Sequence, residues 1–459
     1  MPVWLFNNSP ASHVPADGER PWQKLVSLVP TFRLSLIIFL IAVFVRLFII
    51  FAFHVYTDPF RGELERTAFS LATTGVYGNP YRVPTGPTAH VAPGYTLILA
   101  AILKIFGAGK TGEMVRMLTA TCVSSLLWAL MPPVSERLSM DKSVGVLAGL
   151  AGALLPARVL VEIDGQWEAP YTALALVLIA TISLHLWRKQ DLNLKQALLH
   201  GLAWGVCLLF VPALLDIFVV LLAAGFYFCH RAGWRRYLTF AGIEILAVAV
   251  CLAPWVVRNY RALGSPIVTR TNLGLELRVS NNDEASPDQR INSVGEVFNL
   301  YHPLFNTHEA LEVRRLGEVA YNRRAEEEAK MWIRAHPRRF LELCLGRMRC
   351  YWLYTDPASR IKTLLLGGTV LLGFLGLVYL WRRNQAAGTL AALILVLYPL
   401  PNYLIHVGLR QEYPIHWLMT LLAALAITCM WEQIRGSVSK PPFASVRNSP
   451  RKPGRLPRL

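Results

Sequence analysis

The sequence has little charge and little cysteine for its 459 residues. Charged side chains make up 16% of the chain, whereas soluble globular proteins carry about 25%. This deficit, together with the high apolar content, excludes an ordinary soluble enzyme and a disordered chain. The seven cysteines form no C-x-x-C spacing, and most of them lie within apolar runs. We therefore predict neither a structural disulfide nor a cysteine-bound metal.

Several motifs with a defined chemistry are absent too. The chain contains no G-x-x-x-x-G-K-[ST], no dinucleotide-binding fingerprint ahead of a helix, no H-E-x-x-H and no G-x-S-x-G. Such motifs bind phosphates, dinucleotides or zinc, or present a serine nucleophile. A nucleotide-sugar donor therefore has no support in the sequence. There is also no evident inverted repeat with paired broken helices, which many transporters have.

Long apolar runs are abundant instead. Hydrophobic residues make up 54% of the chain, and the mean hydropathy is +0.39. About 20 residues of helix cross the hydrocarbon layer of a membrane. We predict an all-α polytopic membrane protein with apolar segments at 34–57, 92–107, 115–132, 143–156, 168–187, 196–212, 214–229, 238–256, 361–381, 387–402 and 414–431.

The 46 basic residues outnumber the 29 acidic ones and give a net charge of +17. Much of this excess flanks apolar segments, which favours membrane orientation and anionic lipid over nucleic acid as its explanation. The positive-inside rule places these groups in the cytoplasm: Lys104, Lys110, Arg116, Arg188-Lys189, His230 to Arg236, Arg382-Arg383 and the basic tail. Eleven crossings cannot put both basic ends inside, so we predict ten to twelve spans. On this reasoning, a segment between 115 and 167 is miscounted or does not cross.

We expect five regions along the chain. They are a cytoplasmic N-terminal tail (1–33), a transmembrane module (34–256) with an outer loop at 58–90, an outer-face region (257–360), further transmembrane helices (361–431) and a basic cytoplasmic tail (432–459). In the outer-face region, residues 308–352 have the pattern of an amphipathic helix, broken near His336-Pro337. In the outer loop, Leu64, Ala68 and Leu71 recur at helical spacing and predict a short helix.

This outer loop contains the residues best suited to catalysis. It begins Gly62-Glu63-Leu64-Glu65-Arg66. A carboxylate on a short helix above the first span is well placed to act as a general base, because it is partly desolvated while its substrate arrives. The alternative is a solvated helix face on which Glu63 pairs with Arg66 at i,i+3 spacing.

The loop resembles the first outer loop of the GT-C membrane glycosyltransferases, which take sugars from polyprenyl-phosphate carriers. The closer branch contains the protein O-mannosyltransferases and the lipid A aminoarabinose transferases. Further segments resemble that branch in the same order: Trp167-Glu168, Pro254 to Tyr260, Arg270 to Glu276, Asn281-Asn282, Gly317 to Tyr321, Pro337 to Phe340 and His406 to Pro414. Together they cover residues 34–431.

The resemblance implies GT-C architecture and a catalytic base among the acidic residues of the first outer loop. This role falls on Glu63, although the family usually has aspartate there, and Glu65 and Asp58 are the alternatives. Glu168 matches a second acidic site that orients the acceptor or holds a metal. Stabilisation by the dipole of its own helix is the other explanation for Glu168.

Arg258 and Arg410 stand at predicted outer ends of spans. Guanidinium groups suit phosphate oxygens, so we expect them to bind the phosphate of the donor. Snorkelling toward lipid headgroups is the alternative. Relatives often have Arg-Tyr-Arg near the second position, whereas this chain reads Arg410-Gln411-Glu412.

Three further residues complete the candidates. His90 and His406 could bind a divalent metal with Glu63 or Glu168, or serve as hydrogen-bonded structure, and no other cofactor is expected. Arg46, inside the first span, should pair with an acid or with the backbone of the bundle.

The resemblance implies an inverting membrane glycosyltransferase that uses a polyprenyl-phosphate sugar and an unidentified lipid, glycan or protein acceptor. The resemblance implies a bacterial inner membrane with the active site facing the periplasm. A lipid-linked sugar flippase or transporter is the alternative, with Arg46 and Asp216 marking its path. A scaffold without catalysis is a third hypothesis.

Overall fold

The computed structural model describes residues 26–55, 62–155, 158–189, 192–229, 233–294, 296–353 and 359–438. Within these ranges every regular element is a helix, and β pairing is limited to two isolated bridges, Gly78–Pro87 and Asp288–Val407. The predicted all-α class is confirmed for this part of the chain. Asp58, one of the candidate bases, lies outside the described residues.

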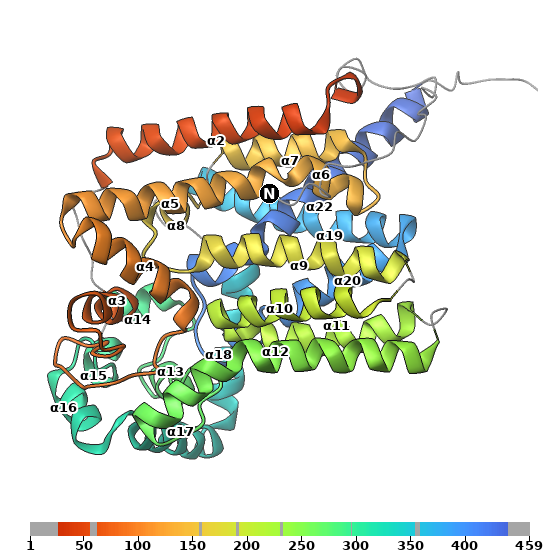
Figure 1. Cartoon of the computed structure of the whole chain (residues 1–459). Coiled ribbons are helices and arrows are strands. Elements are labelled where there is room, and N and C mark those ends of the chain that lie inside the picture. Colours follow the sequence, from red (N-terminus) through yellow and green to blue (C-terminus); the bar gives the residue numbers. More distant parts are fainter. Residues whose placement is uncertain are drawn as a thin grey trace, which may run out of the picture.

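Apolar helices that run side by side form a bundle (Figure 1). They are α2 (Thr31–Ala52), α5 (Lys110–Ala129), α7 (Lys142–Leu154), α9 (Ala169–Lys189), α10 (Leu194–Phe210), α11 (Leu215–Phe228), α12 (Trp234–Leu263), α19 (Arg360–Arg383), α20 (Gln385–Leu397) and α22 (Leu409–Val438). Short helices α6 (Met131–Arg137), η3 (Pro212–Leu214) and α21 (Leu400–Leu404) join or extend them. By length and composition, seven helical segments of the described chain are suited to cross a membrane, and α7, α10 and α11 are shorter apolar helices.

The bundle holds together through large buried side chains and close backbone contacts. Trp128, Trp204 and Trp417 are each about 1% exposed. Where α19 meets α22, a Cβ atom on Gly376 would lie 1.9 Å from the carbonyl oxygen of Leu422. Only glycine permits this approach, as is common where membrane helices pack.

The predicted partner of Arg46 is present inside the bundle. Its guanidinium lies 2.8 Å from the carboxylate of Glu162, and both residues are buried. Trp128 and Tyr413 also donate hydrogen bonds to Glu162, at 2.9 and 3.0 Å. The charge of Arg46 is therefore compensated, as a buried cation requires.

The remaining helices gather at one end of the bundle, at the left and lower left of Figure 1. This loop end comprises α3 (Glu63–Thr74), α4 (Pro93–Phe106), α8 (Val159–Asp164), α13 (Leu273–Ser280), α14 (Gln289–Val294), α15 (Glu296–Tyr301), α16 (Thr307–Leu316), α17 (Glu318–Ala335) and α18 (Pro337–Trp352). The predicted break at His336-Pro337 is confirmed. A second break, at Gly317 with φ of 82°, was not predicted.

The segment predicted as a span at 92–107 forms α4, which lies at the loop end. Helix α4 packs along α3 through Tyr95 and Leu99, and Tyr95 donates a hydrogen bond to the carbonyl of Gly165. Three residues link α4 to α5, whose Arg116 pairs with Glu65 of α3. Both ends of α4 are thus at the loop end, which Figure 1 also shows.

This placement corrects the predicted topology. Arg116 lies at the loop end, opposite the far end that carries Arg188-Lys189 and Arg382-Arg383 (Figure 1). Without α4, the ten bundle helices alternate in direction, so α2 begins and α22 ends at the same far end. Both α4 (Pro93–Phe106) and α7 (Lys142–Leu154) are shorter apolar helices, so the predicted non-crossing segment between 115 and 167 stays a prediction.

Candidate functional site

Helix α3 carries two of the predicted catalytic carboxylates in its first turn. Gly62 precedes it in an extended conformation, and Glu63 and Glu65 complement the positive end of the helix dipole. Gly75 ends the helix with φ of 75°, a conformation that favours glycine. Leu64 and Ala68 pack against α4, which fixes the orientation of the helix.

Glu63 faces two histidines. Its Oε1 lies 3.2 Å from Nε2 of His302, which follows α15, and 4.0 Å from Nε2 of His90. The side chain of Glu63 is only 11% exposed. Nδ1 of His90 lies 3.2 Å from the hydroxyl of Tyr81. Burial lowers the pKa of His90 to about 4 despite the opposing charge of Glu63, so His90 is neutral at neutral pH.

The alternative base, Glu65, has different surroundings. Its carboxylate forms a buried ion pair with Arg116, which also pairs with Glu113. Glu65 is therefore tied into the α3–α5 contact, whereas Glu63 lies beside two histidines.

Next to this site, Glu276 forms an ion pair with His406, the second histidine proposed for a metal. Glu276 Oε2 lies 3.2 Å from Nδ1 of His406, and Asn272 donates to Oε1 at 2.8 Å. Burial raises the pKa of Glu276, but His406 and Arg270 outweigh this and hold it below its usual range. In the part of the chain that the structure describes, no three metal-ligating side chains come together.

A buried carboxylate that the sequence did not single out, Glu318 of α17, anchors the outer loop. It accepts hydrogen bonds from Thr88, from the backbone N–H of Ala89 at 2.7 Å and from Thr271 at 2.5 Å. Burial raises its pKa. Glu318 thereby fixes the segment that leads into His90.

Arg410 lines a cavity of about 610 Å³ at the loop end, together with Arg290, Arg349 and Trp167. Its guanidinium lies 3.7 Å from the ring centroid of Trp167. Arg290 is paired with Asp288 at 2.5 Å. Glu412, which pairs with Arg158, also lines the cavity. Among the described residues no carboxylate pairs with Arg349 or Arg410, so these two guanidinium groups have no ion-pair partner there.

An apolar groove of about 450 Å³ adjoins this cavity and shares Leu409 with it. Its lining includes four exposed apolar side chains, Leu154, Leu160, Ile361 and Leu365. A cationic cavity next to an apolar groove matches the two parts of an amphiphile with an anionic head.

The second acidic candidate, Glu168, borders a small cavity of about 20 Å³ together with Leu64, Arg270 and Arg410. Its Oε2 is buried and has no hydrogen-bond partner among the described residues. A buried carboxylate oxygen without a hydrogen-bond partner costs free energy. A ligand that donates a hydrogen bond to this oxygen of Glu168 would remove that cost.

Arg258 does not share a cavity with Arg410. It donates to the carbonyls of Thr88 and Tyr77 at 2.6 and 2.5 Å, and its guanidinium lies 5.0 Å from the ring of Tyr77. It lines a separate groove of about 590 Å³ with Trp255 and other apolar residues. A single donor phosphate between the two arginines is therefore not what the geometry favours.

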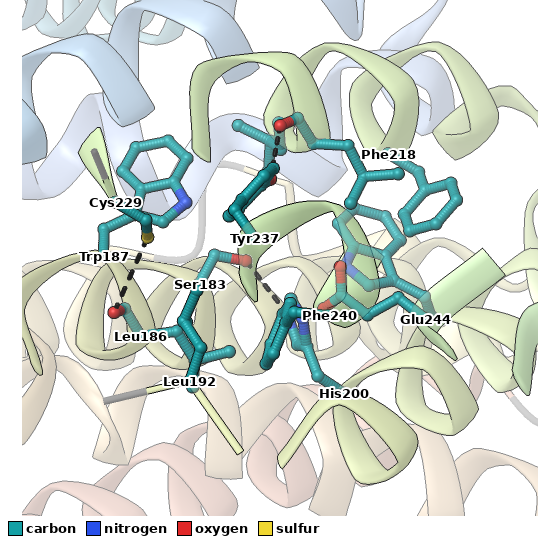
Figure 2. Close-up of a pocket in the computed structure, with 13 residues that line it drawn as sticks. Ser183, Leu186, Trp187, Leu192, His200, Phe218, Cys229, Tyr237, Phe240 and Glu244 are labelled. Carbon is teal, nitrogen blue, oxygen red and sulfur yellow. Dashed lines mark hydrogen bonds and ion pairs between the residues drawn. The ribbon is translucent and has the colours of Figure 1, made fainter. Parts of the chain in front are cut away.

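A further polar cluster lies between α9, α10 and α12 (Figure 2). Ser183 points toward His200, with 3.1 Å between Oγ and Nε2, and Nδ1 of His200 contacts Glu244. The cavity around them is about 20 Å³. Because a water molecule fills about this much space, the cluster is a buried network and not a sugar site.

Of the residues that line these sites, sequence reasoning missed His302, Arg270, Glu276, Glu318 and Arg349. Arg270, Glu276 and Glu318 did lie in segments that resembled the family. His302 and Arg349 had no local signal, because both stand in the outer-face region among other polar residues.

No protein-family model matches the chain, and no curated protein matches its sequence. Solved structures do match. One is the oligosaccharyltransferase of Archaeoglobus fulgidus in its apo form, with a TM-score of 0.53, 14% identity, and coverage of 90% of this chain and 53% of that one. Its complex with Zn and sulfate matches with a TM-score of 0.55 and 15% identity, over 88% of this chain and 50% of that one. Its complex with an inhibitory peptide and a dolichol-phosphate matches with a TM-score of 0.50 and 14% identity, over 94% of this chain and 52% of that one.

This chain therefore spans about half the length of the structures it matches. At such low identity the likeness shows the fold. It leaves open whether the chain belongs to the branch of O-mannosyltransferases and aminoarabinose transferases. The apolar helices and this likeness establish an integral membrane protein with the GT-C fold.

Proposed function

We propose that the protein is a membrane glycosyltransferase that moves a sugar from a polyprenyl-phosphate carrier to an acceptor at the loop end. The observation that carries the proposal is the cavity beside Arg410. It joins unpaired arginines to an apolar groove on the bundle surface. Water-soluble donors have no use for such a groove, whereas a lipid-linked phosphate needs both parts.

The donor phosphate binds Arg410 and Arg349, and the polyprenyl chain lies in the groove between α8 and α19. Guanidinium groups stabilise the charge that develops on the leaving phosphate, which is where the transition state needs it. The stacking of Arg410 on Trp167 holds the planar guanidinium group in place before the donor arrives. Arg258, in its separate groove, remains a second candidate and is tested in parallel.

Glu63 is the general base. An acceptor hydroxyl or amine attacks the anomeric carbon from the face opposite the phosphate, and Glu63 takes its proton. The bond from the anomeric carbon to the phosphate oxygen breaks as the bond to the acceptor forms. Polyprenyl phosphate is released and the configuration inverts without a covalent sugar–enzyme intermediate.

Glu168 orients the acceptor in this scheme. Its unpartnered Oε2 lies on the small cavity that Leu64 and Arg410 also line, between the helix of the base and the donor cavity. Because the basic far end matches the cytoplasmic side by the positive-inside rule, we place catalysis on the outer face of a bacterial-type inner membrane.

A transporter without bond chemistry gains no support. Arg46, one of the charges proposed to mark its path, is compensated by Glu162 inside the bundle.

The test uses the purified protein in liposomes, with radiolabelled polyprenyl-phosphate sugars and cell-envelope extract as the acceptor source. Wild type should transfer label off the lipid and release polyprenyl phosphate. Glu63→Gln should reduce turnover by about 10²-fold or more, since general-base catalysis contributes about 10²–10⁴. The matched control is Glu327→Gln, on an exposed position of α17. Label that stays on the lipid with every donor shown to bind would overturn the proposal, and full activity of Glu63→Gln would reassign the base.

A further inference from the structure

We propose that His302 is a positioning residue for the base: its Nε2–H donates one hydrogen bond to Glu63, which fixes the orientation of the carboxylate. This inference rests on the proposed function, because it assigns a partner to the proposed base.

The backbone determines which nitrogen of His302 carries the proton. The N–H of Leu304 donates to Nδ1 of His302 at 3.2 Å. A backbone N–H is always a donor, so Nδ1 must be an acceptor without a proton. The proton of the neutral ring is therefore on Nε2, which lies 3.2 Å from Oε1 of Glu63.

Aromatic side chains hold the imidazole in this orientation. The ring of His302 lies edge-on to Phe298 at 5.3 Å and to Phe305 at 5.7 Å between centroids, and Tyr81 approaches at 6.4 Å. His302 is about 5% exposed. The donor atom thus cannot turn away from Glu63 without repacking three rings.

This arrangement suits a base because only one carboxylate oxygen is engaged. Both histidine contacts of Glu63 are to Oε1. No donor among the described residues binds Oε2, which leaves that oxygen for the proton of an acceptor. A neutral donor stabilises the carboxylate without placing a full positive charge beside it, which would make the carboxylate a weaker base.

Other charged and titratable groups surround the pair from several elements. His90 and Tyr81 come from the outer loop, Arg270 and Glu276 from the start of the outer-face region, and His406 from the segment before α22. His90 is the closest to Glu63 after His302, but its 4.0 Å separation exceeds hydrogen-bond reach. These groups are the same in every variant compared below.

The experiment measures kcat/KM against pH in liposomes for His302→Phe and His302→Gln. Phenylalanine fills the ring site without a donor, whereas the amide N–H of glutamine reaches the position of Nε2. Loss of a hydrogen bond to the ionised form raises the pKa of a carboxyl. The acid limb of the profile should therefore move to higher pH by about one unit in His302→Phe, and His302→Gln should restore it. The KM for the donor should not change, because His302 does not line the donor cavity.

His308→Phe, at an exposed position of α16, is the matched control and should retain the wild-type profile. Should His302→Phe fail to fold, His302→Asn replaces it, because its amide is too short to reach Glu63. Two results would overturn the inference. One is an acid limb of His302→Phe at the same pH as in wild type, and the other is a pH profile of His302→Gln equal to that of His302→Phe. Glu63→Gln separates the two proposals: if it is inactive while His302→Phe matches wild type, only the role of His302 falls, and if it is fully active, the assigned base falls.

Discussion

Replacement of Arg410 tests the proposed donor site directly. Its guanidinium stacks on Trp167 at 3.7 Å, lines the cavity of about 610 Å³ and has no ion-pair partner in the described chain. Arg410→Ala removes both the positive charge and the planar guanidinium group with its N–H donors. Arg410→Lys keeps the charge but loses the planar fork and its stacking.

The expected effect follows from the bonds that are lost. A hydrogen bond to a charged group contributes about 1.5–3 kcal/mol. With Arg349 still present on the other wall, Arg410→Ala should weaken donor binding by about 2–3 kcal/mol, or roughly 30- to 150-fold. Arg410→Lys should weaken it by about tenfold, because a point charge cannot bind two phosphate oxygens in the same way.

The assay is the KM for the polyprenyl-phosphate sugar together with inhibition by free polyprenyl phosphate, which reports on head-group binding alone. Arg338→Ala is the control, because that side chain is 94% exposed and outside the cavity. If Arg410→Ala binds donor and polyprenyl phosphate as tightly as wild type, the phosphate binds elsewhere and the reasoning fails. Arg258→Ala would then be the variant expected to weaken binding.

Two stability predictions concern the bundle. Arg46→Met leaves the buried carboxylate of Glu162 without its cation and should reduce the free energy of unfolding by about 3–5 kcal/mol, measured by urea unfolding in bicelles. An unfolding free energy equal to that of wild type would contradict this role of the pair. Gly376→Ala should lower the thermal unfolding temperature in detergent, because a Cβ there meets the Leu422 carbonyl at 1.9 Å. Gly368→Ala, with nothing within 4 Å, should not, and equal effects would contradict this packing.

Hydrophobic patterning predicted where helices form but not which of them cross the membrane. Helix α12, for example, was expected at 238–256 and extends over Trp234–Leu263. The segment at 92–107 has the same apolar composition, yet α4 lies against α3. Its inner face and its outward face are both apolar, as buried Leu99 and exposed Leu97 illustrate. Composition cannot separate a membrane-facing helix of the loop end from a span.

Charge counting failed at Arg116 for a related reason. The positive-inside rule concerns solvated basic residues near span ends, whereas Arg116 is buried between Glu65 and Glu113. A cation that is neutralised inside the protein carries no information about topology. Only tertiary structure shows that its partners come from α3.

The candidate site shows the same division between local and distant information. Glu63 was predicted because its surroundings in the sequence resemble a known loop, and its helix is present as predicted. Its partner His302 comes from the middle of the outer-face region. Arg349 of α18 and Arg410 of α22 line one cavity although they are far apart in sequence. No single segment contains the signal for such pairs, since long-range packing creates them.

The small cavity between these groups sets a condition on the proposed reaction. Leu64, adjacent to the base, and Arg410, in the donor cavity, both line this space of about 20 Å³. Inversion requires the acceptor and the leaving phosphate on opposite faces of one sugar ring, so the ring must lie between them. Since such a space admits about one water molecule, a sugar can enter only after Trp167 or its neighbours move apart. The stacking of Arg410 on Trp167 is the contact that donor binding should open first, because the phosphate competes for the same guanidinium.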